Sequence, residues 1–274
     1  IGDDKELQRR QSFVASNVLP QDHFSIVDAS RASEIAGINL TSPGVWYPYA
    51  GCLNTTALAM ALTREIDVRL NCEVTLFEPF TDQGQRKWKL SISGSGEDLE
   101  FDSVVLANAF NVRNFAQPES LSVIMNRGQV STCPPNKVSA NLKTIVNGSG
   151  YITPAIKGQH VFGATFERLY CYDEAKDKSV TTERHDHNLS LLNEIVPDIS
   201  EQINPLDLGG RTSVRGTTFD RLPLVGPVYQ EQQYRHDYVG LKNGQKSKSS
   251  WPRGEYYENL FCAVESFNCS KVNP

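Results

Sequence analysis

The chain has 274 residues, of which 39% are hydrophobic and 22% charged, a composition typical of a globular protein with a substantial core. Its formal net charge of −5 argues against a dedicated nucleic-acid-binding module, so we expect no DNA partner, although a local patch could still contact RNA. No stretch approaches the roughly 20 apolar residues that span a bilayer, which predicts no membrane segment.

The spacing of cysteines and histidines adds two expectations. The six cysteines are scattered without C-x-x-C pairs, which is typical of reduced thiols and favours a cytoplasmic location over a disulfide framework. His185 and His187 lie close together in a polar stretch, but no further ligand stands at metal-binding spacing. We therefore predict no metal site.

Helix and strand patterns alternate in the first part of the chain. Residues 4–17 predict a helix, and residues 24–28 predict a strand followed by a helix that ends at Gly37. A further helix is expected to begin at Asn54 or Thr55. Its expected buried face consists of Leu58, Ala61, Leu62 and Ile66.

From residue 72 onward, strand patterns dominate. A three-stranded meander is expected at 72–80, 86–93 and 99–109, and the apolar run VVLANA at its end predicts a strand buried on both faces. Further strands are expected at 127–133, 148–156 and 160–167.

The later part of the chain is expected to hold one long helix and an irregular tail. Residues 181–196 predict a helix that ends at Pro197, with the charged segment 183–187 facing solvent. Residues 230–255 are polar and rich in turn-forming residues, which predicts a surface excursion or a partly disordered segment. Together these patterns predict an α/β or α+β fold with two lobes.

Short motifs identify no chemistry directly. No G-x-G-x-x-G run opens a helix after a strand, and the glycine-rich segment 93–98 is better explained as a hairpin turn. Neither a Walker A sequence nor a G-x-S-x-G elbow is present.

Residues 211–228, RTSVRGTTFDRLPLVGPV, are more informative. On an extended strand Arg211, Ser213 and Arg215 point to one face, and two neighbouring guanidinium groups repel unless an anion or an aromatic face meets them. Asp220 could neutralise one of them. The alternative is an exposed strand with a partial salt bridge of little energetic value.

Two other segments carry the same kind of ambiguity. Residues 43–58 place clustered aromatic residues and glycines before a capped helix, which suits either a ligand site or a buried aromatic turn. Small residues at the end of 101–109 would let either a ligand or a packed helix approach the backbone.

Taken in order, these segments resemble FAD-dependent oxidoreductases of the D-amino-acid oxidase/glycine oxidase type. Within that family they look like the C-terminal oxidase half of bifunctional enzymes that modify the wobble uridine of tRNA. The resemblance covers residues 25–228. The family forms are G-G-W-x-x-P, V-V-L-A-x-G and R-x-G-x-R-x-x-x-x-D-x-x-P-x-x-G, and the last of these is the most specific.

The resemblance implies a set of site residues. Near the flavin ring or the substrate it places Trp46, Tyr47, Arg211 and Arg215. As cofactor-binding residues it implies Gly51, Val74, Ala107, Asn108, Ala109, Asp220, Pro223 and Gly226. The chain departs from the family pattern at Asn108-Ala109, where the family has x-Gly, and at Ser213, which replaces a frequent glycine.

The resemblance also implies a fold and a reaction. The fold is a partial Rossmann-type FAD lobe over 1–110, an antiparallel substrate lobe over 111–210 and a return to the FAD lobe over 211–274. The reaction is FAD-dependent oxidation of a secondary amine. In the tRNA enzymes it acts on carboxymethylaminomethyl-thiouridine, before a separate methyltransferase domain that uses S-adenosylmethionine.

Two departures predict weak or no FAD binding by this chain alone. The dinucleotide fingerprint would precede residue 1, as if the chain were part of a longer protein, and only a glycine-free remnant of the closing flavin segment stands at 267–271. The alternatives are a stand-alone oxidase of glycine or sarcosine and a non-catalytic substrate-lobe fragment. A tRNA contact is expected at Lys242, Lys246, Lys248 and Arg253, for which a solvated loop is the simpler explanation.

Overall fold

The computed structural model describes residues 8–9, 11–12, 20, 22–94, 96, 98–244 and 254–264. Its strands are β1 (Ser25–Val27), β2 (Gly44–Trp46), β3 (Val74–Asp82), β4 (Gln85–Ile92), β5 (Asp98–Phe101), β6 (Val104–Leu106), β7 (Val123–Cys133), β8 (Val146–Asn147), β9 (Tyr151–Ile152), β10 (His160–Gly163), β11 (Glu167–Leu169), β12 (Gly209–Thr218), β13 (Leu224–Tyr229) and β14 (Tyr256–Val264). Its helices are α2 (Ala29–Ala36), α3 (Thr55–Leu62), α4 (Thr182–Ile195), α5 (Pro197–Ser200), α6 (Glu231–Asp237) and α7 (Val239–Lys242), with 3-10 turns η1 (Ala109–Asn114), η2 (Ser139–Asn141), η3 (Glu174–Lys176) and η4 (Pro205–Asp207).

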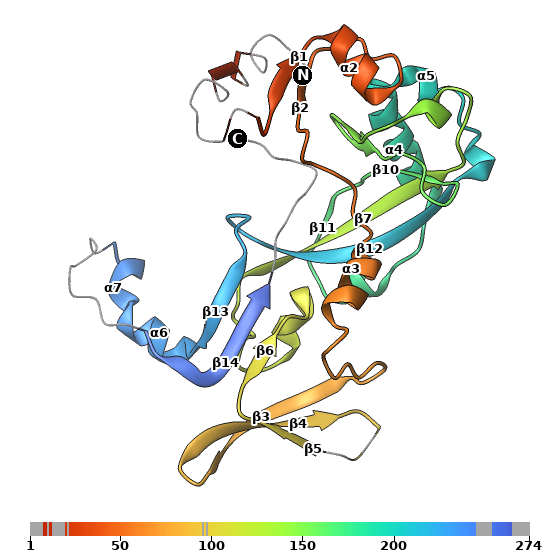
Figure 1. The fold of residues 1–274 in the computed structure, drawn as a ribbon. Helices are drawn as coiled ribbons and strands as arrows, with labels where there is room; N and C mark the ends of the chain where they lie inside the picture. The colour runs from red at the N-terminus through yellow and green to blue at the C-terminus, as the bar shows by residue number, and fades with distance from the viewer. Residues whose placement is uncertain are drawn as a thin grey trace.

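The long strands β7 and β12 run side by side through the middle of the molecule (Figure 1). They pair antiparallel from Gly209↔Thr132 to Thr218↔Val123. On the other edge of β7, β11 pairs near its beginning and β10 near its end, and β9 and β8 extend the sheet beyond β10. This six-stranded antiparallel sheet confirms the antiparallel lobe expected from the sequence.

Helix α4 covers one face of this central sheet. Its Leu192 belongs to a buried cluster with Phe162 of β10 and Ile152 of β9. The same cluster takes in Ala36, so α2 packs onto the central sheet as well. The cluster joins Ala36, from the first expected lobe, to residues of the second, such as Leu192. The boundaries expected at 110 and 210 stay a prediction.

A second sheet has the order β13-β14-β6. β14 pairs antiparallel with β13 and parallel with β6. Leu260 of β14 and Leu106 of β6 are buried in a second cluster, which also holds Phe77 and Trp88 of the β3-β4-β5 hairpin sheet. The indole N–H of Trp88 donates to the carbonyl of Glu258 at 3.0 Å, and this bond helps to attach the hairpin sheet to β14.

Local signals fixed two helices as predicted. The Asp28 side chain caps α2, and Gly37 ends it in the left-handed conformation at φ 75°. A Cβ on Gly37 would lie 2.3 Å from the carbonyl oxygen of Asn141, so the close packing there also requires glycine. Thr181 caps α4, and Pro197 begins the separate helix α5.

The prediction of a single third meander strand over 99–109 is wrong, because this segment divides into two strands. β5 pairs with β4, whereas β6 joins the other sheet beside β14, with Asp102 and Ser103 between them. The expectation that this run is buried on both faces is also wrong. Leu106 is buried, but the side chain of Val105 is 61% exposed because nothing among the described residues covers that face.

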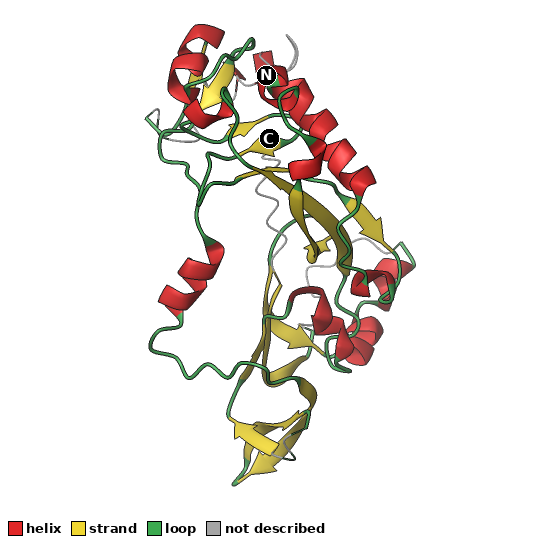
Figure 2. Cartoon of the chain, turned by 90° about the vertical axis from the view of Figure 1, so that its right-hand side faces the viewer, coloured by secondary structure: helices red, strands yellow, loops and turns green. Residues whose placement is uncertain are grey.

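The prediction that one face of α3 is buried is also wrong. Asn54 caps the helix as expected, but Ile66 lies beyond its end, and no residue of the helix is buried. Leu58 is 39% and Leu62 is 68% exposed. Figure 2 shows α3 between two extended segments, apart from the sheets. An apolar helix face is buried only where a partner meets it, and the described residues supply none.

Smaller corrections concern the later segments. Residues 160–167 form two strands, because β10 ends at Gly163 and β11 begins at Glu167. His185 does not face solvent as expected. It is half-buried, and its Nδ1 lies 2.8 Å from the Ser131 hydroxyl. The tail expected to be irregular forms α6 and α7, and residues 245–253 lie outside the described residues.

Candidate functional site

The two faces of β7 are used differently. Side chains alternate along a strand, and Gln129 and Ser131 face α4, where Gln129 bonds to Thr181 and Ser131 to Asn188. Their neighbours along β7 therefore point to the opposite side.

The register places three residues of β12 on that opposite side. Arg211 pairs with Val130, Ser213 with Gly128 and Arg215 with Asn126. Arg211, Ser213 and Arg215 are all exposed, and we call this side of β7 and β12 the open face. The strand expected for residues 211–215 and the shared orientation of these three residues are confirmed.

Tyr151 joins the two arginines, and sequence reasoning missed it. Its neighbour Ile152 is buried beneath α4, so Tyr151 points toward the open face. The pairings Tyr151↔Gly163, Gly163↔Val130 and Val130↔Arg211 align it with Arg211 across the sheet. No motif in the sequence marks this tyrosine, because its position depends on three strand pairings.

Electrostatics supports the grouping. Burial raises the pKa of the Tyr151 phenol, and the positive charges of Arg215 and Arg211 act in the opposite direction on that pKa. Cys52 also acts electrostatically on the phenol, which brings the segment before α3 near the open face. The phenol is therefore a protonated hydrogen-bond donor at neutral pH, within electrostatic range of two guanidinium groups.

The side chain of Asp220 stabilises the turn after β12. Its carboxylate accepts the backbone N–H of Leu222 at 3.0 Å, and the Thr218 hydroxyl donates to the carbonyl of Leu222 at 2.6 Å. The hydrogen bond from the Leu222 N–H lowers the pKa of Asp220. This short-range bonding shapes the turn that leads through the exposed Pro223 into β13, as expected for a turn residue.

The predicted cofactor residues lie at several strand ends. Ala107 and Asn108 are exposed at the end of β6, and Ala109 begins η1 with φ 52°, a conformation that favours glycine. This matches the glycine that the family pattern has at that place. Gly226 of β13 has φ 149°, and open space surrounds the position where its Cβ would stand.

Other predicted residues lie elsewhere. Trp46 ends β2, where it pairs with Ser25, and the Tyr47 ring lies 6.3 Å from that of Phe24. Gly51 is exposed before α3. The side chain of Val74 is half-buried at the start of β3. The described structure thus brings together Arg211, Arg215 and Tyr151, whereas Trp46 and Val74 belong to two other sheets.

An antiparallel six-stranded sheet attached to a mixed sheet is the arrangement of glycine-oxidase-type flavoenzymes. The chain belongs to the FAD-dependent oxidoreductase family, whose DAO profile matches residues 2–250. Among solved structures it is similar to glycine oxidase from Bacillus cereus, with a TM-score of 0.69 and 16% identity, covering 97% of this chain and 66% of that one. For glycine oxidase from Geobacillus kaustophilus the TM-score is 0.66 and the identity 20%, covering 96% of this chain and 62% of that one.

The relatives found by sequence are more similar to this chain than the solved structures are, and they share one name. The chain is 31% identical over 242 residues to the tRNA 5-methylaminomethyl-2-thiouridine biosynthesis bifunctional protein MnmC of Chromobacterium violaceum, covering 87% of this chain and 36% of that protein. To the protein of the same name from Nitrosospira multiformis it is 34% identical over 235 residues, covering 81% and 37%. The chain therefore spans little more than a third of the length of these relatives.

The described residues fit the flat ring of FAD. The exposed end of β6 and the open backbone at Gly226 suit close approach by a flat ring, and Val105 and Phe261 leave an apolar face beside them. Helix α2 is unsuited to the diphosphate, because it begins at the carboxylate of Asp28, which repels phosphate. The closing segment expected at 267–271 lies outside the described residues.

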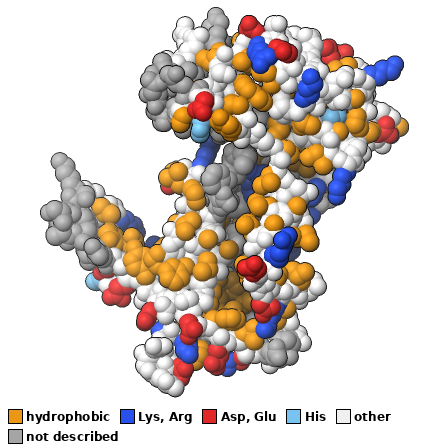
Figure 3. Space-filling model, viewed as in Figure 1, with side chains coloured by type: hydrophobic (Ala, Val, Ile, Leu, Met, Phe, Trp, Pro, Cys, Tyr) orange, Lys and Arg blue, Asp and Glu red, His pale blue; other side chains and the backbone are white. Residues whose placement is uncertain are grey.

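The exposed apolar surface near these strand ends is extensive. Figure 3 shows hydrophobic side chains gathered along the arm formed by β13, β14 and α6. Among them, Val225 is 74% exposed. Within the described residues there is no group of three or more potential metal ligands, and no helix of sufficient length and hydrophobicity to cross a bilayer.

Proposed function

We propose that this chain supplies the substrate-binding part of an FAD-dependent enzyme that oxidises a secondary amine bearing a carboxylate. The observation that supports this proposal is the convergence of Arg211, Arg215 and the protonated Tyr151 on the open face. Guanidinium groups bind carboxylates through charge-assisted hydrogen bonds, and the phenol can add a third donor. In this proposal the three residues hold the carboxylate and thereby orient the amine.

The finer proposal is that the substrate is carboxymethylaminomethyl-thiouridine at the wobble position of tRNA. This group carries the required carboxylate and secondary amine, and the names of the MnmC relatives refer to biosynthesis of a related thiouridine. Bound FAD would supply the two-electron acceptor for the C–H bond beside the amine. The chain's own residues need only bind and orient the substrate. A methyltransferase activity that uses S-adenosylmethionine, and a cytoplasmic location, also belong to this proposal.

A direct experiment uses the natural protein that carries this sequence. tRNA that holds the carboxymethylaminomethyl group is incubated with the FAD-loaded protein, digested and analysed as nucleosides by mass spectrometry. We expect loss of the carboxymethyl group with the wild-type protein and a much slower loss with Arg215→Ala. An unchanged nucleoside profile with a protein that shows flavin absorbance would contradict the proposal.

A second candidate is oxidation of a free amino acid such as glycine or sarcosine, because the fold is that of glycine oxidases. It uses the same carboxylate-binding residues on a smaller substrate. Peroxide release with free amino acids, together with no reaction on tRNA, would favour it. If neither substrate reacts and FAD does not bind, the chain is a non-catalytic substrate lobe.

A further inference from the structure

A cleft of about 380 Å³ lies at the beginning of β7, beside the end of β11. β11 pairs with β7 only from Met125 to Arg127, so this edge of β7 is uncovered at Val123 and Ile124. The polar residues that line the cleft are Arg113, Glu119, Ser120, Ser122, Arg168 and Tyr170.

The cleft is close to the group formed by Arg211, Arg215 and Tyr151. Arg168 pairs with Asn126, and Asn126 pairs with Arg215, so Arg168 and Arg215 lie on the same face of the sheet. Two strand spacings separate them, a distance of about 10 Å. A polymer whose reactive group occupies the open face at Arg215 therefore has a neighbouring unit within reach of Arg168.

The cleft presents a ready surface for stacking. Tyr170 is 82% exposed, and the guanidinium carbon of Arg168 lies 5.7 Å from the centre of its ring. The cation–π contact orients the ring without covering it fully. Because exposed aromatic rings and arginine planes are the usual partners of unstacked nucleic-acid bases, this pair suits a base.

The second arginine is fixed by backbone contacts. Nε of Arg113 donates to the carbonyl of Glu119 at 3.3 Å, and Nη1 donates to the carbonyl of Val123 at 3.4 Å. Neither bond uses Nη2. The Glu119 carboxylate on the same wall would repel a simple anion, but it can accept a hydrogen bond from a ribose hydroxyl.

We propose that this cleft binds a nucleotide of an RNA substrate next to the reacting one, with its base on Tyr170 and its phosphate at Arg168 and Arg113. This inference rests on the proposed function, because it assumes that the reacting group is part of RNA. It assigns RNA contact to a local surface of a chain whose formal net charge is −5. It also differs from the basic loop expected from the sequence, of which the structure describes Lys242 but not 246–253.

Binding of a fluorescent tRNA anticodon stem-loop to the natural protein tests this inference. Anisotropy titrations at several salt concentrations compare the wild type with Tyr170→Ala and Arg168→Ala. We expect Tyr170→Ala to weaken binding about tenfold, as for the loss of one stacked base. Arg168→Ala should lower the slope of log affinity against log salt by about one, because one phosphate contact is lost.

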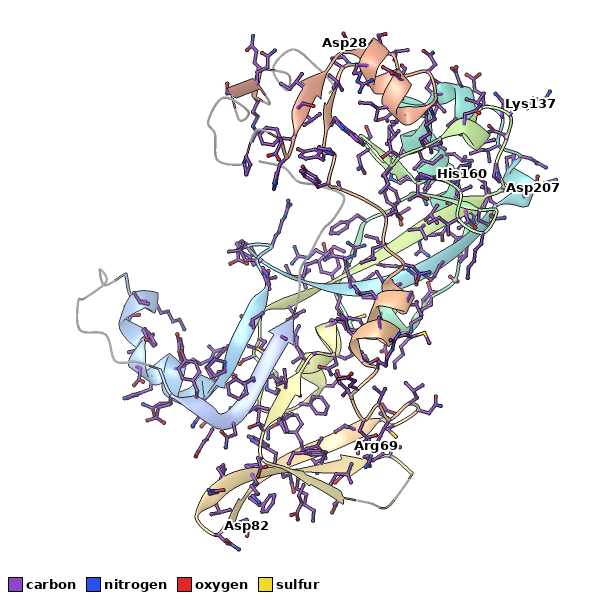
Figure 4. All side chains as sticks on the ribbon, viewed as in Figure 1. Asp28, Arg69, Asp82, Lys137, His160 and Asp207 are labelled. Atoms are coloured by element: carbon purple, nitrogen blue, oxygen red, sulfur yellow. The ribbon has the colours of Figure 1, made fainter. Side chains whose placement is uncertain are left out.

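Two control variants separate the site from general effects. Tyr170→Phe keeps the ring and should bind as the wild type does. Arg69, labelled in Figure 4, lies beside the β3-β4-β5 sheet and forms an ion pair with Asp67 at 3.6 Å. Arg69→Ala removes one exposed arginine away from the cleft and should leave both affinity and salt slope unchanged. Circular dichroism checks that each variant is folded.

Several outcomes would overturn the inference. They are unchanged binding by Tyr170→Ala and Arg168→Ala, equal loss with Tyr170→Phe, no RNA binding at all, or displacement of the RNA by inorganic phosphate at equal concentration. The proposed function fails separately, through an unchanged nucleoside profile in the oxidation experiment. Binding that depends on Tyr170 in a protein that does not oxidise the modified uridine would support this cleft and reject the proposed reaction.

Discussion

The two faces of β7 and β12 show how one pair of strands can serve structure on one side and binding on the other. Toward α4, Gln129 and Ser131 are fully buried and their polar atoms are paired within the protein. Toward the open face, Arg211 and Arg215 are exposed beside Tyr151. Buried polar groups with internal partners stabilise a fold, whereas exposed charges that converge on one surface are available for a ligand.

The sharpest contrast is expected in cysteine reactivity. Burial raises the pKa of the Cys133 thiol to about 11 and excludes reagents, whereas Cys52 is exposed near the open face. We expect iodoacetamide at pH 8 to label Cys52 rapidly and Cys133 only after unfolding, since the thiolate is the reactive form. Peptide mass spectrometry of native and urea-treated protein measures both rates. Equal labelling in the native state would show that the α4 face is not closed.

The next largest effect is expected at Gln129. Its side chain accepts the Thr181 N–H at 2.9 Å and donates to the Thr181 carbonyl at 3.0 Å, so it fixes the start of α4. Gln129→Ala should lower the free energy of unfolding by about 2–4 kcal/mol, because buried backbone groups lose their partners. Urea denaturation measures this. Ser213→Ala, on the open face, is the matched control and should change stability by less than about 0.5 kcal/mol.

Arg215→Ala should affect substrate binding and not stability, in contrast to Gln129→Ala. Because its side chain is exposed, Arg215→Ala should leave the unfolding free energy nearly unchanged. If it binds the substrate carboxylate, its loss should raise KM about tenfold or more, as for a hydrogen bond to a charged group. Steady-state kinetics and urea denaturation of the same variant measure both quantities. A large loss of stability with normal KM would assign Arg215 to the structural side.

The smallest effect is expected at the turn after β12. The hydrogen bond from the Leu222 N–H lowers the pKa of Asp220 in the folded state. A lowered folded pKa contributes stability above the unfolded pKa, and that contribution is lost as pH falls through the folded pKa. Asp220→Asn should thus be slightly less stable than the wild type at pH 6 and equal to it near pH 2. Thermal unfolding at both pH values measures the difference, and a constant difference would contradict the assignment.

The sequence determined the elements whose signals are local. Asp28 and Gly37 bound α2, and Thr181 and Pro197 bound α4. Each of these depends on residues within a few positions of one another, through capping or left-handed backbone. The resemblance to the oxidoreductase family likewise followed from short ordered segments, and the DAO profile confirmed it.

Only the tertiary structure decided which of these elements meet. Tyr151 lies in line with Arg211 across the sheet because three separate strand pairings align, and strand register is fixed by distant partners. Leu62 of α3 and Val105 of β6 look like core residues in the sequence, yet they are exposed because burial requires a second surface. Periodicity thus specifies which face of an element is apolar, and the rest of the fold decides whether that face is covered.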